Sequence, residues 1–554
     1  MSHQISRRQF VQGVAVAGLA ASTGVWAKST RPFAINGQVP HLTGNTFDLV
    51  VDEASVNYTG KTKIATVVNG SLPAPVLHFK EGETVTIRVT NRLKEDTSIH
   101  WHGLILPYQM DGVPGISFKG IPPNSTFIYQ FPLLQSGTYW YHSHSGFQEQ
   151  TGMMGAIVIE PRGGETIRAD RDHVIMLSDW TDADPMGLLG KLKMESGFDN
   201  YQQPTAVQFF ADVRKNGFTR AVADRKMWNE MRMMPTDFTD LSAHTFTYLM
   251  NGTNPASNWT GLFSKGDKVR LRFINGSAQT IFDVRIPGLK LMVIGSDGQL
   301  VEPVTVDEFR IGVAETYDVL VEPTDDAYTI FAQNIDRTGY ACGTLAVQAG
   351  LKAPTPALDK IQWLSMTDMM GAMSEKSMSG KTMSRHAKTE YGFSVDQRVD
   401  MPRTNLDDAG VNLRNNGRRV LTYADLHSIG SAKTEQVEPS REIEMHLTGN
   451  MERYIWGFDG LTFHESKPVR LGKGERVRIS LVNDTMMTHP MHLHGMWSDL
   501  RSAEGDFQVR KHTIVVQPAQ KISFDVTGEA GRWAWHCHLL YHMESGMFRE
   551  VVVD

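Results

Sequence analysis

The chain is poor in cysteine and has no surplus of positive charge. Only two of its 554 residues are cysteines, Cys342 and Cys537, so it can form at most one disulfide. Its formal net charge of -6 excludes the basic surface expected of a nucleic-acid-binding protein. No uncharged run beyond the N-terminus reaches the ~18 residues needed to cross a bilayer, so we expect the mature protein to be soluble. A chain of this length is expected to form several domains.

The N-terminus has the features of an export signal. Residues 6–11 carry a twin-arginine motif, an apolar run covers residues 14–25, and a small-residue cleavage site follows at residues 25–27. We interpret residues 1–27 as a cleaved signal for the twin-arginine export machinery, which places the mature protein in the periplasm. A short N-terminal membrane anchor is the alternative, although the run is too short to span a bilayer stably.

Two sequence patterns each recur three times. The first is a turn followed by a strand of alternating apolar residues, at residues 82–91, 266–275 and 474–483. The second occurs at residues 137–142, 327–332 and 531–536. Three copies of both patterns predict three similar all-β domains, and short strands separated by Gly/Pro turns favour β-sandwiches.

The segments between the repeats suggest the domain boundaries. We expect domain one at residues 40–165, domain two at 166–350 and domain three at 415–554. Between the last two, residues 351–414 have few β-branched residues and many methionines, which indicates a Met-rich linker or lid. Residues 201–237 of domain two are less strand-like and are expected to include short helices.

Histidines occupy matching repeat positions in the first and third copies but not in the second. Each histidine-bearing copy has one pair after the first pattern and one after the second, at His100 and His102, His142 and His144, His492 and His494, and His536 and His538. The second copy has Val284 and Ile286 in place of the first pair. Domain two is therefore expected to be structural, and domains one and three are expected to share a metal cluster.

The segment from His536 to Met547 combines a thiol, imidazoles and a distant thioether, which is the donor set of a blue-copper site. Side chains alternate along a strand, so His536 and His538 face one way and Cys537 faces the other. One segment is thus predicted to serve two metal sites. The first copy has Ser143 where the third has Cys537, so only domain three can supply the thiolate. A buried structural cysteine flanked by surface histidines is the alternative.

Together, the four histidine clusters and the threefold repeat resemble the multicopper oxidases over nearly the whole mature chain. The resemblance implies three cupredoxin-like Greek-key β-sandwich domains holding four copper ions, with Cys537 passing electrons between sites. The type 1 ligands it implies are His489, Cys537 and His542, with Met547 axial. The type 2 ligands are His100 and His492, and the two type 3 triplets are His102, His142 and His538, and His144, His494 and His536. Which type 3 ion each triplet binds stays open.

Asp111 matches the position of a family carboxylate near the type 2 copper, and we predict that it relays protons to dioxygen. A solvated turn residue in Asp111-Gly112 is an equal alternative, since Asp-Gly is a common turn pair. Some family members have a second carboxylate directly after the last type 1 histidine. This chain has Met543 there, which leaves a second proton relay without support.

The methionines suggest a substrate, because thioethers prefer Cu(I). The linker holds a candidate Cu(I) site in a polar stretch, formed by Met366, Met369, Met370, Met373, Met378 and Met383. A second group, Met227, Met231, Met233 and Met234, could equally fill gaps in a core. With the twin-arginine motif, these features resemble the periplasmic copper-resistance members of the family. That resemblance implies oxidation of Cu(I) to Cu(II), and of phenols, coupled to four-electron reduction of O2 to water.

Two other functions stay open: a laccase-like phenol oxidase in which the methionines are incidental, and a copper-sequestering protein with little turnover. A periplasmic copper chaperone is a possible partner for loading. A monomer suffices, since three domains already enclose the predicted cluster. Cys342 lies in the copper-free domain and is expected to be a buried structural thiol.

Overall fold

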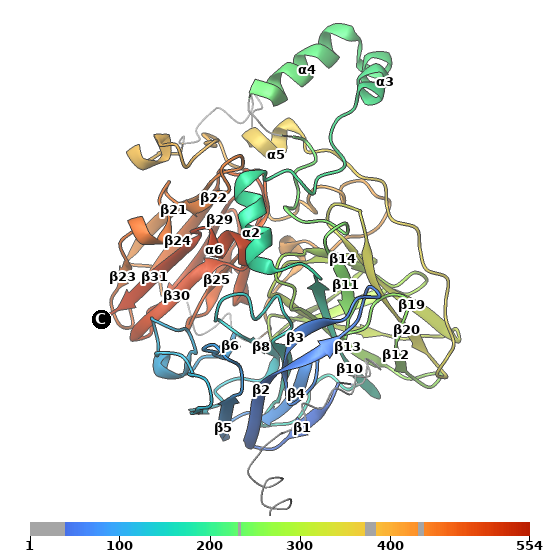
Figure 1. Cartoon of the computed structure of the whole chain (residues 1–554), viewed down its shortest axis with the longest axis vertical. Helices are drawn as coiled ribbons and strands as arrows, with labels where there is room; N and C mark the ends of the chain where they lie inside the picture. The colour runs from blue at the N-terminus through green and yellow to red at the C-terminus, as the bar shows by residue number, and fades with distance from the viewer. Residues whose placement is uncertain (1–38, 231–233, 372–383, 430–436) are drawn as a thin grey trace, which may run out of the picture. The chain divides into compact units, whose positions relative to one another are not determined.

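The computed structural model describes residues 39–230, 234–371, 384–429 and 437–554. Within these ranges the chain forms six β-sheets, two for each part of the sequence that carries one copy of the repeat. Figure 1 shows the strands of the first copy in blue and cyan, those of the second in green, and those of the third in orange and red. The predicted all-β fold is therefore confirmed. The predicted export signal, residues 1–27, lies outside the described residues.

The first copy builds a five-stranded and a four-stranded sheet. In spatial order, the five-stranded sheet contains β1 (His41–Thr43), β4 (Ala74–Lys80), β9 (Met154–Glu160), β8 (Gly137–His142) and β6 (His100–His102). The four-stranded sheet contains β3 (Lys63–Val68), β2 (Thr46–Val56), β5 (Thr84–Asn91) and β7 (Thr126–Pro132). Apolar side chains between the two sheets form one buried cluster, which includes Trp101 and Tyr141.

The second copy builds a six-stranded and a five-stranded sheet. The former contains β11 (Thr247–Met250), β10 (Arg171–Trp180), β13 (Val269–Asn275), β18 (Thr316–Val321), β15 (Leu291–Ser296) and β16 (Gln299–Val306). The latter contains β12 (Trp259–Leu262), β20 (Tyr340–Ala346), β19 (Ala327–Asn334), β14 (Phe282–Arg285) and β17 (Glu308–Ile311).

The third copy repeats this arrangement. Its six-stranded sheet contains β22 (Ile455–Phe458), β21 (Arg441–Asn450), β24 (Arg476–Asn483), β29 (Lys521–Thr527), β26 (Ser498–Arg501) and β27 (Phe507–Lys511). Its five-stranded sheet contains β23 (Val469–Leu471), β31 (Phe548–Val553), β30 (Gly531–Cys537), β25 (His489–Leu493) and β28 (Thr513–Val516). The second and third copies share one apolar core cluster.

Both sequence patterns occupy equivalent strands in the three copies. The first pattern forms β5, β13 and β24, each of which pairs in parallel with the first long strand of its copy. The second forms β8, β19 and β30, each paired antiparallel with the next strand along the chain. The same three strands also pair with β6, β14 and β25, where the second pattern lies beside the first histidine pair or its apolar replacement. Pairing thus places the repeat positions next to one another.

Among the described residues, helices are few and lie mainly outside the sheets. They are α2 (Pro185–Met194), α3 (Ala206–Asn216), α4 (Phe218–Glu230), α5 (Met366–Met370) and α6 (Leu540–Glu544), with short 3-10 turns η1 (Tyr108–Met110), η3 (Lys388–Tyr391), η4 (Tyr423–Asp425) and η6 (Phe463–Glu465). A capping box between Thr205 and Gln208 begins α3. The helices expected within residues 201–237 are α3 and α4, whereas α2 was not expected. No helix of the described residues is long and apolar enough to span a membrane.

The segment after the second copy contacts both neighbouring copies. Val420 forms an isolated β-bridge with Glu308 of β17, and Arg403 forms one with Gln520, just before β29. The first strand of the third copy begins only at Arg441. The start of domain three at residue 415 stays a prediction, and residues 415–440 contain no long strand in the part of the chain that the structure describes.

Candidate metal centre

A thiol and two imidazoles meet at the end of β30. Cys537 is the last residue of that strand, His489 is the first of the adjacent β25, and α6 returns His542 to the same point. Cys537 Sγ lies 3.5 Å from His489 Nδ1 and 4.0 Å from His542 Nδ1, and the two nitrogens are 3.3 Å apart. All three side chains are buried. We call these three residues the thiol site.

Contacts around the thiol site orient both imidazoles. Asp240 Oδ2 lies 2.8 Å from His542 Nε2, and Thr485 Oγ1 lies 2.7 Å from His489 Nε2, so the opposite nitrogen of each ring faces the sulfur. The His542 ring stacks on Trp456, with centroids 3.9 Å apart. Sequence reasoning missed these three residues, because Asp240 and Trp456 are remote in the chain and Thr485 has no distinguishing pattern.

Met547 lies close to the thiol site through the backbone. The Cys537 N–H donates to the Met547 carbonyl oxygen, with the two atoms 3.1 Å apart, and the Met547 side chain is fully buried. The predicted axial thioether is thus held in the turn that follows α6. Its ligand role stays a prediction.

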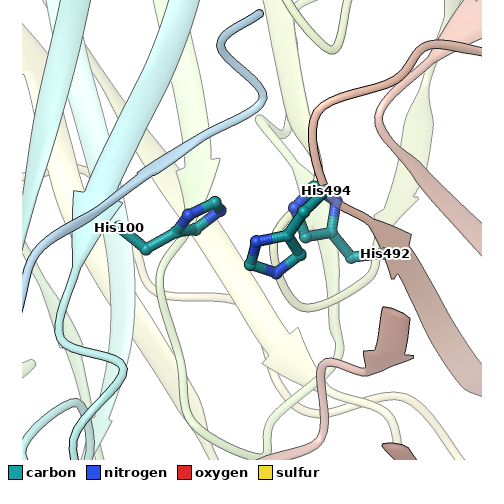
Figure 2. A group of neighbouring side chains, drawn as sticks. All are labelled: His100, His492 and His494. Atoms are coloured by element: carbon teal, nitrogen blue, oxygen red, sulfur yellow. The ribbon is translucent and has the colours of Figure 1, made fainter. Parts of the chain in front are cut away.

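Eight further histidines converge where the first and third copies meet. Strand pairing places His100 opposite His142 in the first copy and His492 opposite His536 in the third. Figure 2 shows His100 approaching from one side and the rings of His492 and His494 from the other. Ring centroids are 3.9 Å apart for His100 and His494, and 3.7 Å apart for His102 and His492. We call this group of eight the histidine cluster; its remaining members are His142, His144, His536 and His538.

One predicted triplet is tightly grouped. His494 Nε2 and His144 Nε2 lie 3.1 Å and 3.3 Å from His536 Nε2. The other predicted triplet is more open, with ring centroids 5.0 Å apart both for His102 and His538 and for His142 and His538. The rings of the predicted pair His100 and His492 are 5.6 Å apart. Several alternative groupings of three have their nitrogens within 4.8 Å of one another, so the geometry does not single out one division of the eight.

The cluster has the free nitrogens that a metal would need. Buried ring nitrogens without a hydrogen-bond partner are His102 Nδ1 and the Nε2 atoms of His100, His142, His492 and His538. A buried polar atom without a partner costs free energy, and five in one cluster are readily explained by metal coordination. The opposite nitrogens are held: His100 Nδ1 lies 2.7 Å from the Asp111 carbonyl oxygen, and His492 Nδ1 lies 2.6 Å from that of His512.

The protonation states expected of buried groups also suit metal binding. Burial lowers the pKa of His489 well below its ordinary value and that of His536 to about 4, so both rings are neutral near pH 7. Burial raises the pKa of the Cys537 thiol far above its ordinary value. The thiol therefore needs a cation beside it to ionise.

Two buried carboxylates contact the histidine cluster. Asp111 is fully buried, and its Oδ2 lies 2.9 Å from His494 Nδ1, which excludes the solvated turn considered for this residue. Glu149 Oε2 lies 2.7 Å from His142 Nδ1, and burial raises the pKa of Glu149 well above its ordinary value. Sequence reasoning missed Glu149, although it lies only five residues beyond His144.

His512 is a further imidazole that sequence reasoning missed. Its Nδ1 lies 3.2 Å from His102 Nε2, and its ring is fully buried. It follows the buried Lys511, whose Nζ lies 3.1 Å from Asp297 of the second copy. A lone histidine outside the repeat offsets gives no signal in the sequence.

The second copy has apolar residues at the positions that match the first histidine pair. Val284 and Ile286 are buried in the apolar core, where the other copies have histidines. Ser143, which replaces Cys537 in the first copy, donates to Gln148 Oε1 at 2.9 Å. Cys342 is buried and unpaired, as a structural thiol would be.

The predicted methionine site is only partly described. Met369 is fully buried in an apolar cluster with Phe238, Ile281 and Leu364, and Met370 packs against that cluster. Met366 begins α5. Met373, Met378 and Met383 lie outside the described residues, as do Met231 and Met233 of the second group. Met369 therefore has a packing role, whatever the thioethers beyond it bind.

A buried thiol with two imidazoles, joined by one strand to a cluster of eight histidines between β-sandwiches, defines a copper protein with several metal sites. Comparisons with known proteins agree with this class. Family models described as multicopper oxidase match residues 50–164, 171–350 and 436–554, and the chain belongs to this family.

Its similarity to particular relatives is also extensive. The chain is 52% identical to copper resistance protein A of Escherichia coli, over 99% of both chains. It is 52% identical to copper resistance protein A of Pseudomonas syringae pv. tomato, over the full length of both. Among solved structures, Fet3p, a multicopper oxidase that functions in iron import, has a TM-score of 0.66 at 19% identity, covering 93% of this chain and 91% of that one. The protein is therefore a copper-related oxidoreductase.

Proposed function

We propose that the protein is a periplasmic oxidase that converts Cu(I) to Cu(II) and reduces O2 to water, in the service of copper resistance. The observation that carries this proposal is the position of Cys537 between His536 and His538 on one segment, with the thiol facing one site and the imidazoles the other. The covalent path from Cys537 to either neighbouring histidine therefore links the thiol site, which is suited to accepting single electrons, with the histidine cluster, which is suited to binding dioxygen.

The residues that would hold copper are those named from the sequence. His489, Cys537 and His542, with Met547 axial, would hold a type 1 ion; His100 and His492 a type 2 ion; and the two remaining triplets a type 3 pair. Four coppers bound in this way supply one-electron transfer at the thiol site and four-electron chemistry at the histidine cluster. The protein supplies fixed ring orientations, through Asp240, Thr485 and Asp111, and excludes water from the buried sites.

Asp111 is the residue best placed to deliver protons. Its Oδ2 contacts His494 Nδ1, and its backbone oxygen contacts His100 Nδ1, so one residue touches both histidine-bearing copies. Dioxygen reduction to water consumes four protons, and a buried carboxylate beside the cluster can pass them from outside.

Cu(I) is favoured as the substrate by three observations. The nearly full-length similarity is to proteins named for copper resistance, and the linker contains thioethers, which prefer Cu(I). Asp240 also lies 2.8 Å from the outer nitrogen of His542, on the side of the ring away from the sulfur. A carboxylate there favours the approach of a cation towards the thiol site.

Export and assembly follow from the sequence. The twin-arginine motif supports transport of a folded, copper-loaded or copper-ready chain to the periplasm. A periplasmic copper chaperone is a suitable loading partner, and a monomer suffices because all ten histidines and Cys537 come from one chain.

Oxidation of phenols is the second candidate. It is favoured by similarity to proteins named laccases, such as laccase-1 of Cryptococcus neoformans, at 26% identity over 93% of this chain and 81% of that one. Pure copper storage is disfavoured, because storage needs no pair of sites joined by a single cysteine.

Oxygen uptake separates these functions. The copper-loaded protein is given Cu(I) or a phenol in an oxygen-electrode cell, with background oxidation measured in the copper-free protein. Rapid uptake with Cu(I) is expected. Uptake with the phenol alone contradicts the proposal, and no uptake with either indicates storage.

A further inference from the structure

Away from the thiol site and the histidine cluster, two histidines and two carboxylates from three segments meet at one point. His386 lies just before η3, and Glu390 lies within it. His446 lies in β21, and Asp484 directly follows β24. The four side chains have relative exposures between 0% and 4%. Residues so far apart in sequence are buried together here, and neither the repeat nor the proposed oxidase chemistry requires them.

The donor atoms form a closed group of four. His386 Nδ1 lies 2.7 Å from Glu390 Oε2 and 3.7 Å from Asp484 Oδ2. His446 Nδ1 lies 2.8 Å from Asp484 Oδ2 and 3.6 Å from Glu390 Oε2. Each imidazole nitrogen therefore faces both carboxylates. In a tetrahedral site with bonds of about 2.0 Å, ligand atoms lie about 3.3 Å apart, within the range seen here.

The charges of the group are not balanced by lysine or arginine. Among the described residues, the only cationic side chains at ion-pair distance from Glu390 or Asp484 are the two histidines. The remaining carboxylate oxygens accept backbone N–H groups, from Ala387 to Glu390 and from Val399 to Asp484, both at 2.8 Å. The two carboxylates can therefore be neutralised by protonated imidazoles, by protonation of Asp484, whose pKa burial raises, or by one divalent cation.

The outer nitrogens of both rings face further carboxylates. His386 Nε2 lies 3.4 Å from Asp400 Oδ1, and His446 Nε2 lies 3.6 Å from Glu444 Oε1. Metal-binding histidines commonly present their second nitrogen to a carboxylate, which leaves the first nitrogen free for the ion. Without an ion, hydrogen bonds to Asp484 and Glu444 outweigh burial and raise the pKa of His446 to about 10, so a metal would have to displace a proton from this ring.

We propose that His386, Glu390, His446 and Asp484 bind one divalent transition-metal ion of the Zn²⁺ or Cu²⁺ type. Two imidazole nitrogens and two carboxylate oxygens suit these ions, whereas Cu(I) prefers sulfur. The ion would fasten the segment that carries His386 and Glu390 to β21 and to the end of β24. Asp484 is also the neighbour of Thr485, which contacts His489 of the thiol site. The site thus ties the linker to the edge of the electron-accepting centre.

Zn²⁺ is the sharper probe, because it undergoes no redox change and its binding does not depend on whether the protein oxidises Cu(I). Protein that holds no more copper than the four ions of the proposed oxidase sites is titrated with Zn²⁺ by calorimetry and analysed for both metals after gel filtration. We expect one retained Zn²⁺ per chain with unchanged copper content. Glu390→Gln and His446→Gln are expected to weaken this binding by at least about 10-fold. Glu442→Gln, a half-exposed carboxylate on the same strand, is the matched control and should bind Zn²⁺ normally.

Folding of each variant is checked from its copper content and its blue absorption, which depends on the separate thiol site. Measurements on the wild-type protein alone also test the proposal. With Cu²⁺ in place of Zn²⁺, the additional ion should give an electron paramagnetic resonance signal with hyperfine coupling to two nitrogens. The proposal is overturned if the wild type retains no additional ion, if that ion shows no nitrogen coupling, or if folded Glu390→Gln and His446→Gln retain Zn²⁺ as tightly as Glu442→Gln.

Discussion

At the scale of single residues, the difference between Cys537 and Ser143 decides what each copy can do. Both residues lie between two histidines: Cys537 is the last residue of β30, and Ser143 directly follows the equivalent strand β8. Ser143 makes a local hydrogen bond to Gln148, whereas Cys537 Sγ faces His489 and His542. One atom exchanged at a matching position thus separates a site that offers imidazoles alone from a site that also offers sulfur as a metal donor.

Replacing that sulfur gives the first prediction. Cys537→Ser should abolish the blue absorption and reduce oxidase turnover to background, because a hydroxyl cannot act as the thiolate ligand. The histidine cluster should still bind copper, since none of its residues is changed. Visible absorption and copper content per chain check both parts. Ser143→Ala is the matched control and should keep the blue colour; a blue Cys537→Ser protein would refute the assignment.

The second residue-scale prediction concerns Asp111. Asp111→Asn keeps the size of the side chain but removes its charge, so oxygen reduction should slow by about 100-fold, as expected for loss of a proton-transferring group. The blue absorption should persist because the thiol site is untouched. Turnover is measured across pH with one reductant. An unchanged pH profile would show that Asp111 only positions His494.

At the scale of secondary-structure elements, α5 shows that one of the linker methionines packs in an apolar cluster. Met369 packs against Phe238 and Leu364 and is fully buried, so a deletion of residues 366–383 would remove part of the fold together with any copper site. Substitution is the cleaner test, because leucine keeps the apolar volume and removes the thioether.

We therefore predict that replacing Met373, Met378 and Met383 together by leucine slows Cu(I) oxidation several-fold and leaves phenol oxidation unchanged. Thioethers at these positions would concentrate Cu(I), whereas a phenol needs none. Rates with both substrates are compared in the same preparation, with Met369→Leu as the control for packing. Equal losses for the two substrates would show that the methionines do not capture copper.

Strand pairing explains how far sequence reasoning could reach. The repeat offsets identified the histidines of β6, β8, β25 and β30, because equal offsets on equivalent strands place side chains at one sheet edge. Asp240, Glu149 and His512 could not be found in this way. Asp240 lies in an irregular segment, Glu149 lies in a turn, and His512 has no counterpart in the repeat, so only the folded chain brings them to the ligands.

At the scale of the whole molecule, burial of many neutral imidazoles links stability to pH. Burial lowers the folded-state pKa of His536 to about 4, below its ordinary value of 6.5, and also lowers the pKa of His489 and His492 well below that ordinary value. The unfolded chain then binds more protons than the folded one at acidic pH. This contribution to stability is complete above about pH 6.5 and is lost as the pH falls towards 4.

The copper-free protein should therefore melt at progressively lower temperature between pH 6.5 and pH 4, with each buried imidazole contributing about 1.4 kcal/mol for every unit by which burial lowers its pKa. Copper should raise the melting temperature most near neutral pH, where ligands are deprotonated. Calorimetry of copper-free and copper-loaded protein across this range checks the trend. A melting temperature that rises on acidification would contradict it.

The whole molecule also shows what the repeat could not predict. The all-β fold and its three copies followed from the sequence, because alternation and turns are local signals. The contacts that join the copies are not local. Lys511 with Asp297, and Arg403 with Gln520, pair residues of different segments whose partners no pattern identifies.

The most direct test of the oxidase assignment is the ratio of Cu(I) consumed to O2 consumed by the copper-loaded protein, with hydrogen peroxide assayed in the same sample. If Cys537 delivers electrons one at a time to a histidine cluster that holds dioxygen until reduction is complete, four Cu(I) ions should disappear for each O2 and no peroxide should accumulate. A ratio of two with matching peroxide, or Cu(I) bound without oxygen uptake, would contradict the account.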